Sequence, residues 1–156
     1  MPEQSRRVAA KLHTHPLFQK AHKILIYNAL WDEVNVLDGY DLSHTDKTFI
    51  LPTVVGDGLE LHRFTYGTQT RIGAFGITES LGETETDYDS IDLAIIPGRA
   101  FTPDGRRLGR GKGYYDRLLP SLHCPTIGVC YPFQLLDDIP TEPHDHTVDE
   151  VITTEQ

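Results

Sequence analysis

Cysteine is scarce in this sequence, and long apolar runs are missing. The two cysteines, Cys124 and Cys130, do not form a redox or zinc spacing, and we expect both to be buried small side chains. No apolar run approaches the roughly 18 residues that a membrane-spanning helix needs, and residues 1–7 lack the apolar core of a signal peptide. These absences argue against a disulfide-stapled secreted protein and against a membrane partner, so we expect a cytoplasmic location.

Positive charge is also in short supply. Lys and Arg number 14 against 23 Asp and Glu, which gives a net charge of −9 at pH 7. Affinity for nucleic-acid phosphates depends on an extended positive surface, so we expect no nucleic-acid partner. A chain of 156 residues with 38% hydrophobic and 24% charged residues is typical of one soluble globular domain. We therefore expect a single domain, residues 1–156, that acts as a monomer on small molecules.

Hydrophobic patterning predicts an α/β fold. Apolar runs bounded by polar residues, proline or glycine predict strands at 24–30, 48–51, 59–64, 91–96, 126–131 and 148–153. Pro52 should end the second of these strands, and Pro16 should divide the region 5–22 into two short helices. Further helical segments are expected at 115–122 and 133–138. Such alternation is typical of a mainly parallel sheet with helices on both faces, a three-layer architecture.

One stretch, residues 98–117, concentrates glycine and positive charge, and we call it the glycine-basic segment. Six of the 14 Lys and Arg residues fall within it, opposed only by Asp104 and Asp116. Gly109, Gly111 and Gly113 alternate there, which removes Cβ atoms where a backbone must approach a ligand closely. The segment follows the expected strand 91–96, and open α/β sheets bind ligands at the carboxyl ends of their strands. The pattern predicts a phosphate site, and the alternative is a flexible loop with solvated basic side chains.

Several single residues have two interpretations from the sequence alone. Asp116, next to a bound polyphosphate, could hold Mg²⁺, or it could simply favour the first turn of a helix. In the acidic segment 142–150, Asp145 or Asp149 could serve a hard cation, or the segment could be a solvated loop. Trp31 could stack on a heterocycle or be a structural aromatic, and Glu33 could accept from a ring N–H or be a surface acid.

The motif residues together resemble the 5-formyltetrahydrofolate cyclo-ligase (methenyltetrahydrofolate synthetase) family. The resemblance runs almost end to end and is most specific in P-G-x-A-F from residue 97 and G-x-R-L-G-x-G-x-G-Y-Y-D from residue 105. It implies a three-layer α/β fold. It also implies the conversion of 5-formyltetrahydrofolate and MgATP to 5,10-methenyltetrahydrofolate, ADP and phosphate through an N5 iminium phosphate.

The resemblance implies a role for each motif residue. The ATP phosphates and the formyl end of the folate would be surrounded by Arg107, Leu108, Gly109, Arg110, Gly111, Lys112, Gly113, Tyr114 and Tyr115. Within that run, Arg110, Lys112 and Tyr114 are the implied catalytic residues. Mg²⁺ would be held by Asp116 and Asp145. The folate would be bound by Glu33, Arg110 and Tyr114, with Trp31 and Phe75 as walls of the pterin pocket.

The sequence departs from the family pattern at its start. Members of the family usually begin with a basic helix that reaches the ATP, and this chain is expected to begin after that helix. Arg6, Arg7 or Lys11 could substitute for its charges. The departure keeps an alternative open, in which the chain is a catalytically weak protein that binds folate or nucleotide.

Overall fold

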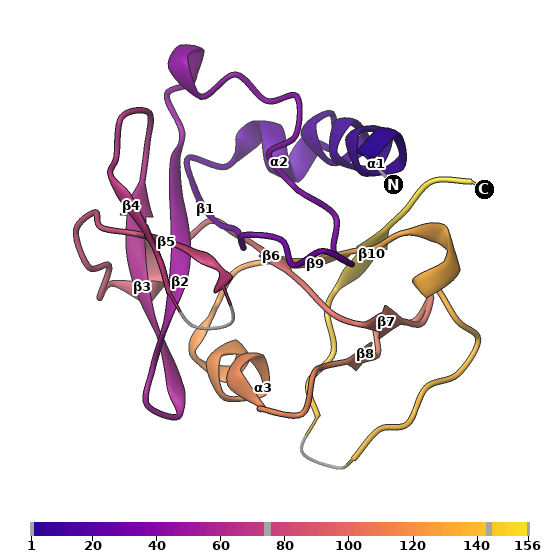
Figure 1. Cartoon of the computed structure of the whole chain (residues 1–156). Helices are drawn as coiled ribbons and strands as arrows, with labels where there is room; N and C mark the ends of the chain where they lie inside the picture. Colours follow the sequence, from indigo (N-terminus) through magenta and orange to yellow (C-terminus); the bar gives the residue numbers. More distant parts are fainter. Residues whose placement is uncertain (1, 74–75, 143–144, 156) are drawn as a thin grey trace.

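The computed structural model describes residues 2–73, 76–142 and 145–155, and its centre is a six-stranded sheet (Figure 1). The strands lie in the order β10-β9-β6-β1-β2-β3. All neighbours are parallel except β2 and β3, which form an antiparallel hairpin. The bounds are Lys23–Leu25 (β1), Thr48–Val55 (β2), Gly58–Phe64 (β3), Leu93–Ile96 (β6), Thr126–Val129 (β9) and Glu150–Ile152 (β10). The predicted α/β class and the mainly parallel sheet are confirmed.

Short helices accompany the sheet. The α-helices are α1 (Pro2–His13), α2 (Pro16–Lys20) and α3 (Tyr114–Leu118), and the 3-10 helices are η1 (Leu42–His44), η3 (Tyr88–Ser90), η4 (Leu119–Ser121) and η5 (Pro132–Gln134). Pro16 begins α2, as the sequence predicts, because a proline is tolerated in the first helical turn. The helical segment expected at 115–122 divides into α3 and η4, and η4 carries Pro120 in its first turn.

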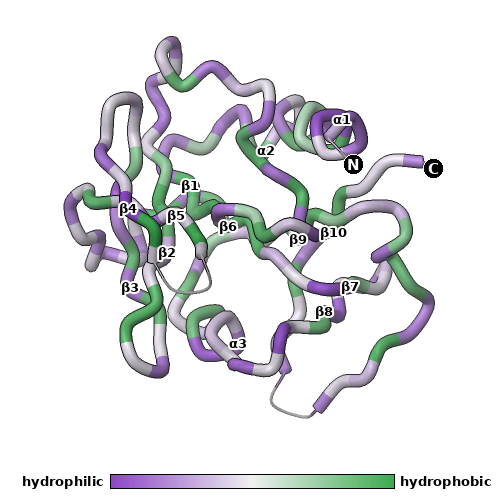
Figure 2. The backbone as a smooth tube through the Cα atoms, in the orientation of Figure 1, coloured by the Kyte–Doolittle hydropathy of each residue, from purple (hydrophilic) through white to green (hydrophobic). Residues whose placement is uncertain are grey.

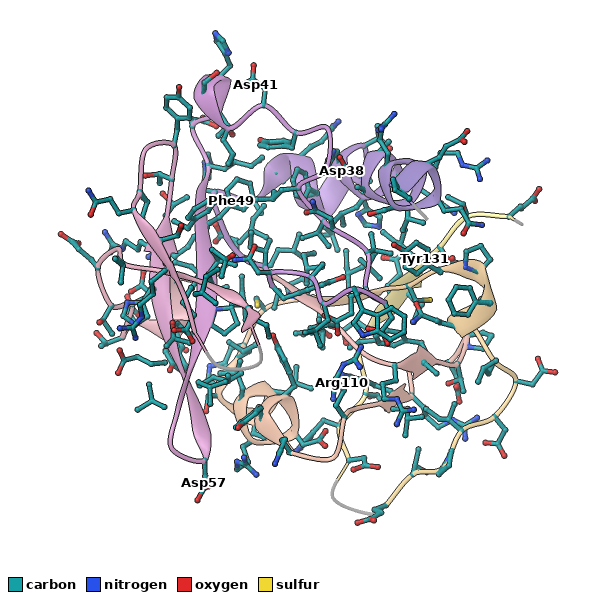
Figure 3. The ribbon with its side chains drawn as sticks, viewed as in Figure 1. Asp38, Asp41, Phe49, Asp57, Arg110 and Tyr131 are labelled. Carbon is teal, nitrogen blue, oxygen red and sulfur yellow. The ribbon has the colours of Figure 1, made fainter. Side chains whose placement is uncertain are left out.

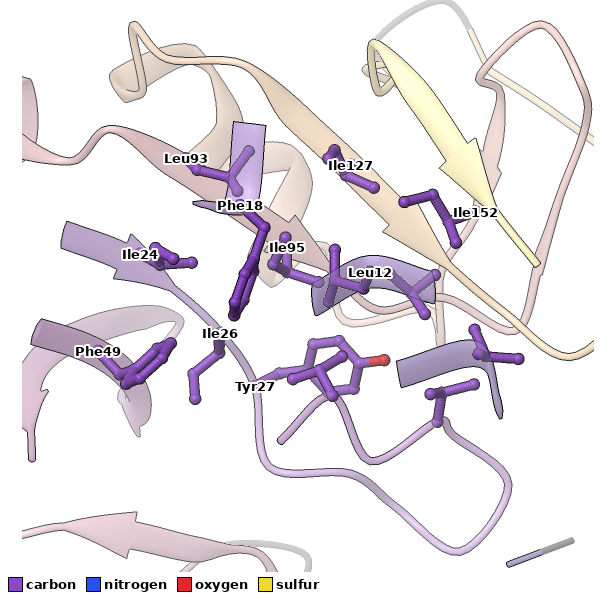
Figure 4. Close-up of a cluster of buried hydrophobic side chains, with 14 of the residues drawn as sticks. Leu12, Phe18, Ile24, Ile26, Tyr27, Phe49, Leu93, Ile95, Ile127 and Ile152 are labelled. Carbon is purple, nitrogen blue, oxygen red and sulfur yellow. The ribbon is translucent and has the colours of Figure 1, made fainter. Parts of the chain in front are cut away.

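Neighbouring residues of the central strands point into different hydrophobic clusters. Ile24 belongs to a cluster that also contains Leu12 of α1 and Phe18 of α2 (Figure 4). The next residue, Leu25, packs with Leu118 of α3 in a second cluster. This alternation follows from the two-residue period of a strand, and each buried Leu, Ile or Phe contributes about 1.5–3 kcal/mol. Figure 2 shows hydrophobic residues along the central strands and hydrophilic ones on the outer side of α1.

The observed strands differ from the expected ranges at their ends, by at most two residues at either end except in β1 and β2. The strand β2 continues through Pro52 to Val55. The Ile50 carbonyl faces β1, because it accepts a hydrogen bond from the Ile26 N–H. Residues two apart in a strand face the same neighbour, so the Pro52 nitrogen also points toward the β1 side, but β1 has already ended there. No donor is needed there, and proline is tolerated. The strand expected at 24–30 was wrong beyond Leu25, since residues 26–30 leave the sheet.

Two small hairpins were not predicted. The first pairs β4 (Thr70–Ile72) with β5 (Thr78–Ser80), and the second pairs β7 (Ala100–Phe101) with β8 (Arg107–Leu108). Strands of two or three residues are too short to leave a hydrophobic period in the sequence. The second hairpin lies inside the glycine-basic segment, so that segment is folded back on itself and is not a simple loop.

Candidate active site

A cavity of about 800 Å³ lies beside the carboxyl ends of β1 and β6. It gathers residues from segments far apart in the sequence, which include the chain after β1, the β2–β3 hairpin, β5, the glycine-basic segment, and residues 140–142 and 145. Its described lining residues include Tyr27, Asn28, Leu30, Glu33, Pro52, Val54, Leu59, Ile77, Glu79, Pro97, Gly98, Pro140, Thr141, Glu142 and Asp145, together with 107–116. The location agrees with the rule that parallel sheets bind ligands at this edge.

The cavity combines an apolar surface with a charged one. Leu30, Val54, Leu59 and Ile77 contribute apolar side chains, while the glycine-basic segment contributes cations and backbone N–H groups. Ligand sites of this kind bury a flat apolar group and orient it with a few polar contacts. The arrangement can therefore accept a molecule, or a pair of molecules, with an apolar part and an anionic part.

Arg107 places a buried positive charge in the cavity wall. Its side chain is only 9% exposed, its Nε donates to the Pro97 carbonyl at 2.6 Å, and its guanidinium lies 5.1 Å from the centroid of the Tyr115 ring. Burial lowers the pKa of this guanidinium. Among the described residues of this segment, Arg106 and Arg110 form salt bridges with carboxylates, whereas Arg107 forms none. Since a buried charge is costly without a counter-charge, the site favours a bound anion.

Two of the glycines in the segment have a clear steric reason. A Cβ at Gly109 would lie 3.0 Å from Nη1 of Arg107, so only glycine leaves the guanidinium its full space. Gly113 has φ of 72°, in the left-handed region that favours glycine, and it caps the N-terminus of α3. The glycine pattern therefore keeps Arg107 accessible to the cavity and turns the chain into α3.

Glu33 and Arg110 meet across the cavity. Glu33 lies on the turn after β1; its Oε1 accepts from the Leu30 N–H at 2.9 Å, and its Oε2 accepts from Arg110 Nη2 at 3.3 Å. Arg110 Nη2 also donates to Asp32 Oδ1 at 2.5 Å. Burial raises the pKa of the Glu33 carboxyl, and the Leu30 hydrogen bond and Arg110 oppose this effect. Glu33 is thus a largely buried acceptor at the edge of the apolar surface.

Asp116 and Asp145 both line the cavity, as the sequence predicts for residues that act at one site. Asp116 Oδ1 accepts from the His146 N–H at 3.3 Å, and Asp145 Oδ2 accepts from the Glu142 N–H at 2.7 Å. Across residues 2–73, 76–142 and 145–155, no group of three or more His, Cys, Asp or Glu side chains is arranged to hold a metal ion. Two carboxylates still fit Mg²⁺, because this ion usually takes only one or two protein carboxylates and completes its shell with phosphates and water.

The structure gathers nearly all the expected site residues in this cavity. Its lining includes the whole run 107–116, with Lys112, Tyr114 and Tyr115, and also Glu33 and Asp145. Trp31 is different: it is 86% exposed and is not part of the described lining. Phe75 lies outside the described residues.

Other sequence expectations are located away from the cavity. Arg6, Arg7 and Lys11 lie on α1, and Lys11 donates to the Thr153 carbonyl at 2.8 Å. Cys130 is buried, whereas Cys124 is only half-buried, so the expectation of two buried cysteines was wrong for Cys124. Among the described residues, no helix combines the length and hydropathy needed to cross a membrane.

Sequence reasoning missed three polar residues of the site. Asn28 and Glu79 line the cavity, and Asp32 holds Arg110. Asn28 Nδ2 donates to the Thr78 carbonyl at 2.6 Å, which ties the chain after β1 to β5. Glu79 ends a short G-I-x-E motif at residues 76–79, and this motif was the available signal. Asp32 was obscured by its neighbour Glu33.

Comparison with known proteins gives consistent results. The profile described as "5-formyltetrahydrofolate cyclo-ligase family" matches residues 2–154. A mouse 5-formyltetrahydrofolate cyclo-ligase is 27% identical over 165 residues, covering 96% of this chain and 81% of the relative. The solved structure of Aquifex aeolicus 5,10-methenyltetrahydrofolate synthetase has a TM-score of 0.84 and 36% identity, covering 97% of this chain and 78% of the other. The Mycoplasma pneumoniae synthetase structure has a TM-score of 0.75 and 26% identity, covering 98% and 86%.

Proposed function

Because the chain belongs to the 5-formyltetrahydrofolate cyclo-ligase family, we propose that it converts 5-formyltetrahydrofolate to 5,10-methenyltetrahydrofolate with the consumption of MgATP and the release of ADP and phosphate. The observation that carries this proposal is the cavity itself. It combines a buried cation, Arg107, with the largely buried carboxylate of Glu33 and an apolar surface. A phosphate group suits the first, and a flat ring with N–H donors suits the other two.

The phosphates of ATP would take the place of the counter-anion that Arg107 lacks among the described residues. Lys112, Arg110 and the backbone N–H groups between Leu108 and Tyr115 would complete the anion site. Charge-assisted hydrogen bonds from guanidinium and ammonium groups to phosphate are among the stronger polar contacts in proteins. Their concentration in one segment supports the assignment of the whole run 107–115 to ATP.

Asp116 and Asp145 would hold Mg²⁺ between the protein and the phosphates. The ion would neutralise part of the charge on the transferred group, as it does in other phosphoryl transfers. The two carboxylates lie at the same cavity as Arg107, whose positive charge both of them favour. This neighbourhood supports a site for a metal that arrives with the nucleotide.

Glu33 would accept hydrogen bonds from the N–H groups of the pterin ring. Burial is the main cause of its raised pKa, because it disfavours the ionised carboxylate. Hydrogen bonds from ring N–H groups would therefore stabilise the ionised form. The apolar side chains of Leu30 and Ile77 offer a surface for the ring. Trp31 and Phe75 are the proposed walls of this pocket.

The reaction would need alignment more than covalent help from the protein. The formyl oxygen attacks the γ-phosphorus, ADP leaves, and an N5 iminium phosphate forms. N10 then attacks the activated carbon and loses its proton, and phosphate leaves as the ring closes. Arg110, Lys112 and Tyr114 would hold the formyl oxygen near the γ-phosphate and stabilise developing charge, because phosphoryl transfer depends largely on positioning and electrostatics.

We also infer that residues 1–156 form one three-layer domain that works as a cytoplasmic monomer. The two hydrophobic clusters on alternate residues of one sheet support the single domain. The net charge of −9 supports small molecules as its partners.

The test is direct. Purified protein is mixed with 5-formyltetrahydrofolate, with and without MgATP, and the absorbance of the methenyl product is followed. A rise that requires MgATP is expected. If tight folate or nucleotide binding is measured by calorimetry but no product forms, the cyclo-ligase proposal is wrong and the protein is a binder.

A further inference from the structure

Arg110 is shared unequally by two neighbouring carboxylates. Its Nη2 lies 2.5 Å from Asp32 Oδ1 but 3.3 Å from Glu33 Oε2, and its Nε lies 3.4 Å from the same Glu33 oxygen. The Asp32 side chain is 20% exposed and the Glu33 side chain only 7%. The closer contact is therefore made by the more exposed carboxylate, and the more buried carboxylate is held loosely. Figure 3 shows Arg110 within the space enclosed by the strands and the glycine-basic segment.

The turn that carries Asp32 is fixed from a different part of the fold. Gln134 Nε2 donates to the Asp32 carbonyl at 3.0 Å, and Tyr131 OH donates to the Glu33 carbonyl at 3.4 Å. Both donors are buried; Tyr131 immediately precedes η5, and Gln134 lies in it. Gln134 Oε1 in turn accepts from the Tyr131 N–H at 3.0 Å. The Asp32 carboxylate is thus presented to Arg110 from a rigid support, whatever Glu33 contacts.

Glu33 has one oxygen that a ligand can compete for. Its Oε1 accepts from the Leu30 N–H, and among the described residues its Oε2 accepts from Arg110. A tight ion pair in so buried a place would be hard to break, because its charges would have to separate in a medium of low dielectric. The contacts between Arg110 and Glu33 Oε2 are long, at 3.3 and 3.4 Å, so a ligand donor can replace Arg110 at this oxygen more easily.

We propose, on the basis of the proposed function, that Asp32 is a positioning residue that draws Arg110 away from Glu33 and so keeps the Glu33 carboxylate available to the pterin. It also keeps Arg110 at the cavity edge when the pterin is hydrogen-bonded to Glu33. Without the Asp32 charge, Arg110 closes onto Glu33 and the two neutralise each other. Asp32 itself touches neither substrate, and it acts through Arg110.

The first experiment compares Asp32→Asn with the wild type and with Asp46→Asn, which makes the same change at an exposed position outside the cavity. We expect Asp32→Asn to raise KM for 5-formyltetrahydrofolate about tenfold and its calorimetric Kd by a similar factor, with kcat changed less than about threefold. Asp46→Asn should leave all three values unchanged. Unchanged KM and Kd in Asp32→Asn would overturn the proposal.

A double-mutant cycle separates action through Arg110 from a merely structural role. In an Arg110→Met background, Asp32→Asn should change KM by less than about twofold, because the residue through which it acts is absent. If the two effects multiply instead, Asp32 acts independently and the proposal is wrong. Asp32→Glu, which keeps the charge, should recover part of the lost affinity even if Asp32→Asn proves unstable, and no recovery in a folded Asp32→Glu protein would count against the proposal.

The cycle also separates this inference from the proposed function. Wild-type protein that neither binds nor converts 5-formyltetrahydrofolate refutes the function and the inference together. Wild-type protein that turns over normally, with independent effects of Asp32 and Arg110, refutes the inference alone.

Discussion

Replacing Arg107 with Met should separate activity from stability. The Arg107 side chain is buried, and burial lowers its pKa because the surroundings disfavour its charge. Methionine keeps a similar length and an adaptable apolar stem. If the guanidinium is there to bind phosphate, the variant should lose affinity for ATP while its fold survives.

The stability change follows from opposing contributions. Losing the 2.6 Å hydrogen bond to the Pro97 carbonyl leaves an unsatisfied acceptor and costs about 1–3 kcal/mol. Losing the contact with the Tyr115 ring costs roughly 0.5–2 kcal/mol. Removing a buried charge that has no carboxylate partner regains a few kcal/mol. The free energy of unfolding should therefore change by about 2 kcal/mol or less, which shifts Tm by under about 8 °C for a chain of this size.

The activity change should be larger. At least one charge-assisted hydrogen bond to phosphate is lost, worth about 1.5–3 kcal/mol, which lowers kcat/KM for ATP roughly 10- to 150-fold. Initial rates of methenyl formation at varied ATP and saturating folate measure this value, and thermal unfolding followed by circular dichroism gives Tm.

The neighbouring Arg106 provides a matched control. Its guanidinium is bound to Asp104 at 3.2 Å and Asp138 at 2.6 Å, and it is not part of the described cavity lining. Arg106→Met should keep kcat/KM for ATP within about twofold. A folded Arg107→Met protein with wild-type kcat/KM for ATP would refute the assignment of Arg107 to phosphate binding.

Three further predictions concern the cavity wall, the core and the metal. In Gly73→Ala the new Cβ collides with the Glu79 carboxylate, so calorimetry should show weaker folate binding and urea unfolding a loss of about 1–3 kcal/mol. Glu85→Gln removes the carboxylate that lies 2.5 Å from the part-buried Lys23 ammonium. It should lower the free energy of unfolding by about 3 kcal/mol at pH 7. Burial raises the pKa of Glu85, but its hydrogen bonds outweigh this and hold the pKa below its usual value; this stabilisation is present above the unfolded pKa and is lost as pH falls through the folded pKa, so wild type and variant should converge in acid. Asp116→Asn should raise the Mg²⁺ concentration needed for half-maximal rate about tenfold or more without changing Tm.

Two of these three predictions have a matched control variant. Gly58→Ala adds a methyl group where nothing lies within 4 Å, and it should leave folate binding unchanged. Glu83→Gln removes a charge from a carboxylate that is largely exposed, so it should cost less than about 1 kcal/mol at any pH. Equal losses in Glu83→Gln and Glu85→Gln, or an unchanged Mg²⁺ requirement in Asp116→Asn, would contradict the reasoning.

The central sheet and the composition of the site could be predicted from local patterns. Strands such as β6 and β9 are continuous apolar runs because they are buried on both faces, and burial of this kind leaves its mark in the sequence. The glycine-basic segment was visible for a similar reason, since alternating glycines and cations have few uses other than a close approach to an anion. The residues 107–116 then line one cavity in the structure.

Local patterns failed where a neighbour in space decides the outcome. Pro52 reads as the end of a strand, but it is tolerated because β1 has ended beside it. The short hairpins β4–β5 and β7–β8 have no hydrophobic period of their own and form by packing on what surrounds them. From the sequence, Trp31 could stack on a heterocycle or be a structural aromatic; in the structure its side chain is exposed, because the chain has already left the sheet.

By itself, the sequence determined the fold class and singled out the segment proposed to bind phosphate, because both depend on composition and short-range periodicity. Only the tertiary structure decided which charges meet. Arg110 is held by Asp32 and Glu33, which precede it by 78 and 77 residues, and Arg107 is buried without such a partner among the described residues. Coulomb energies depend on distance and burial, and neither quantity is set until the chain has folded.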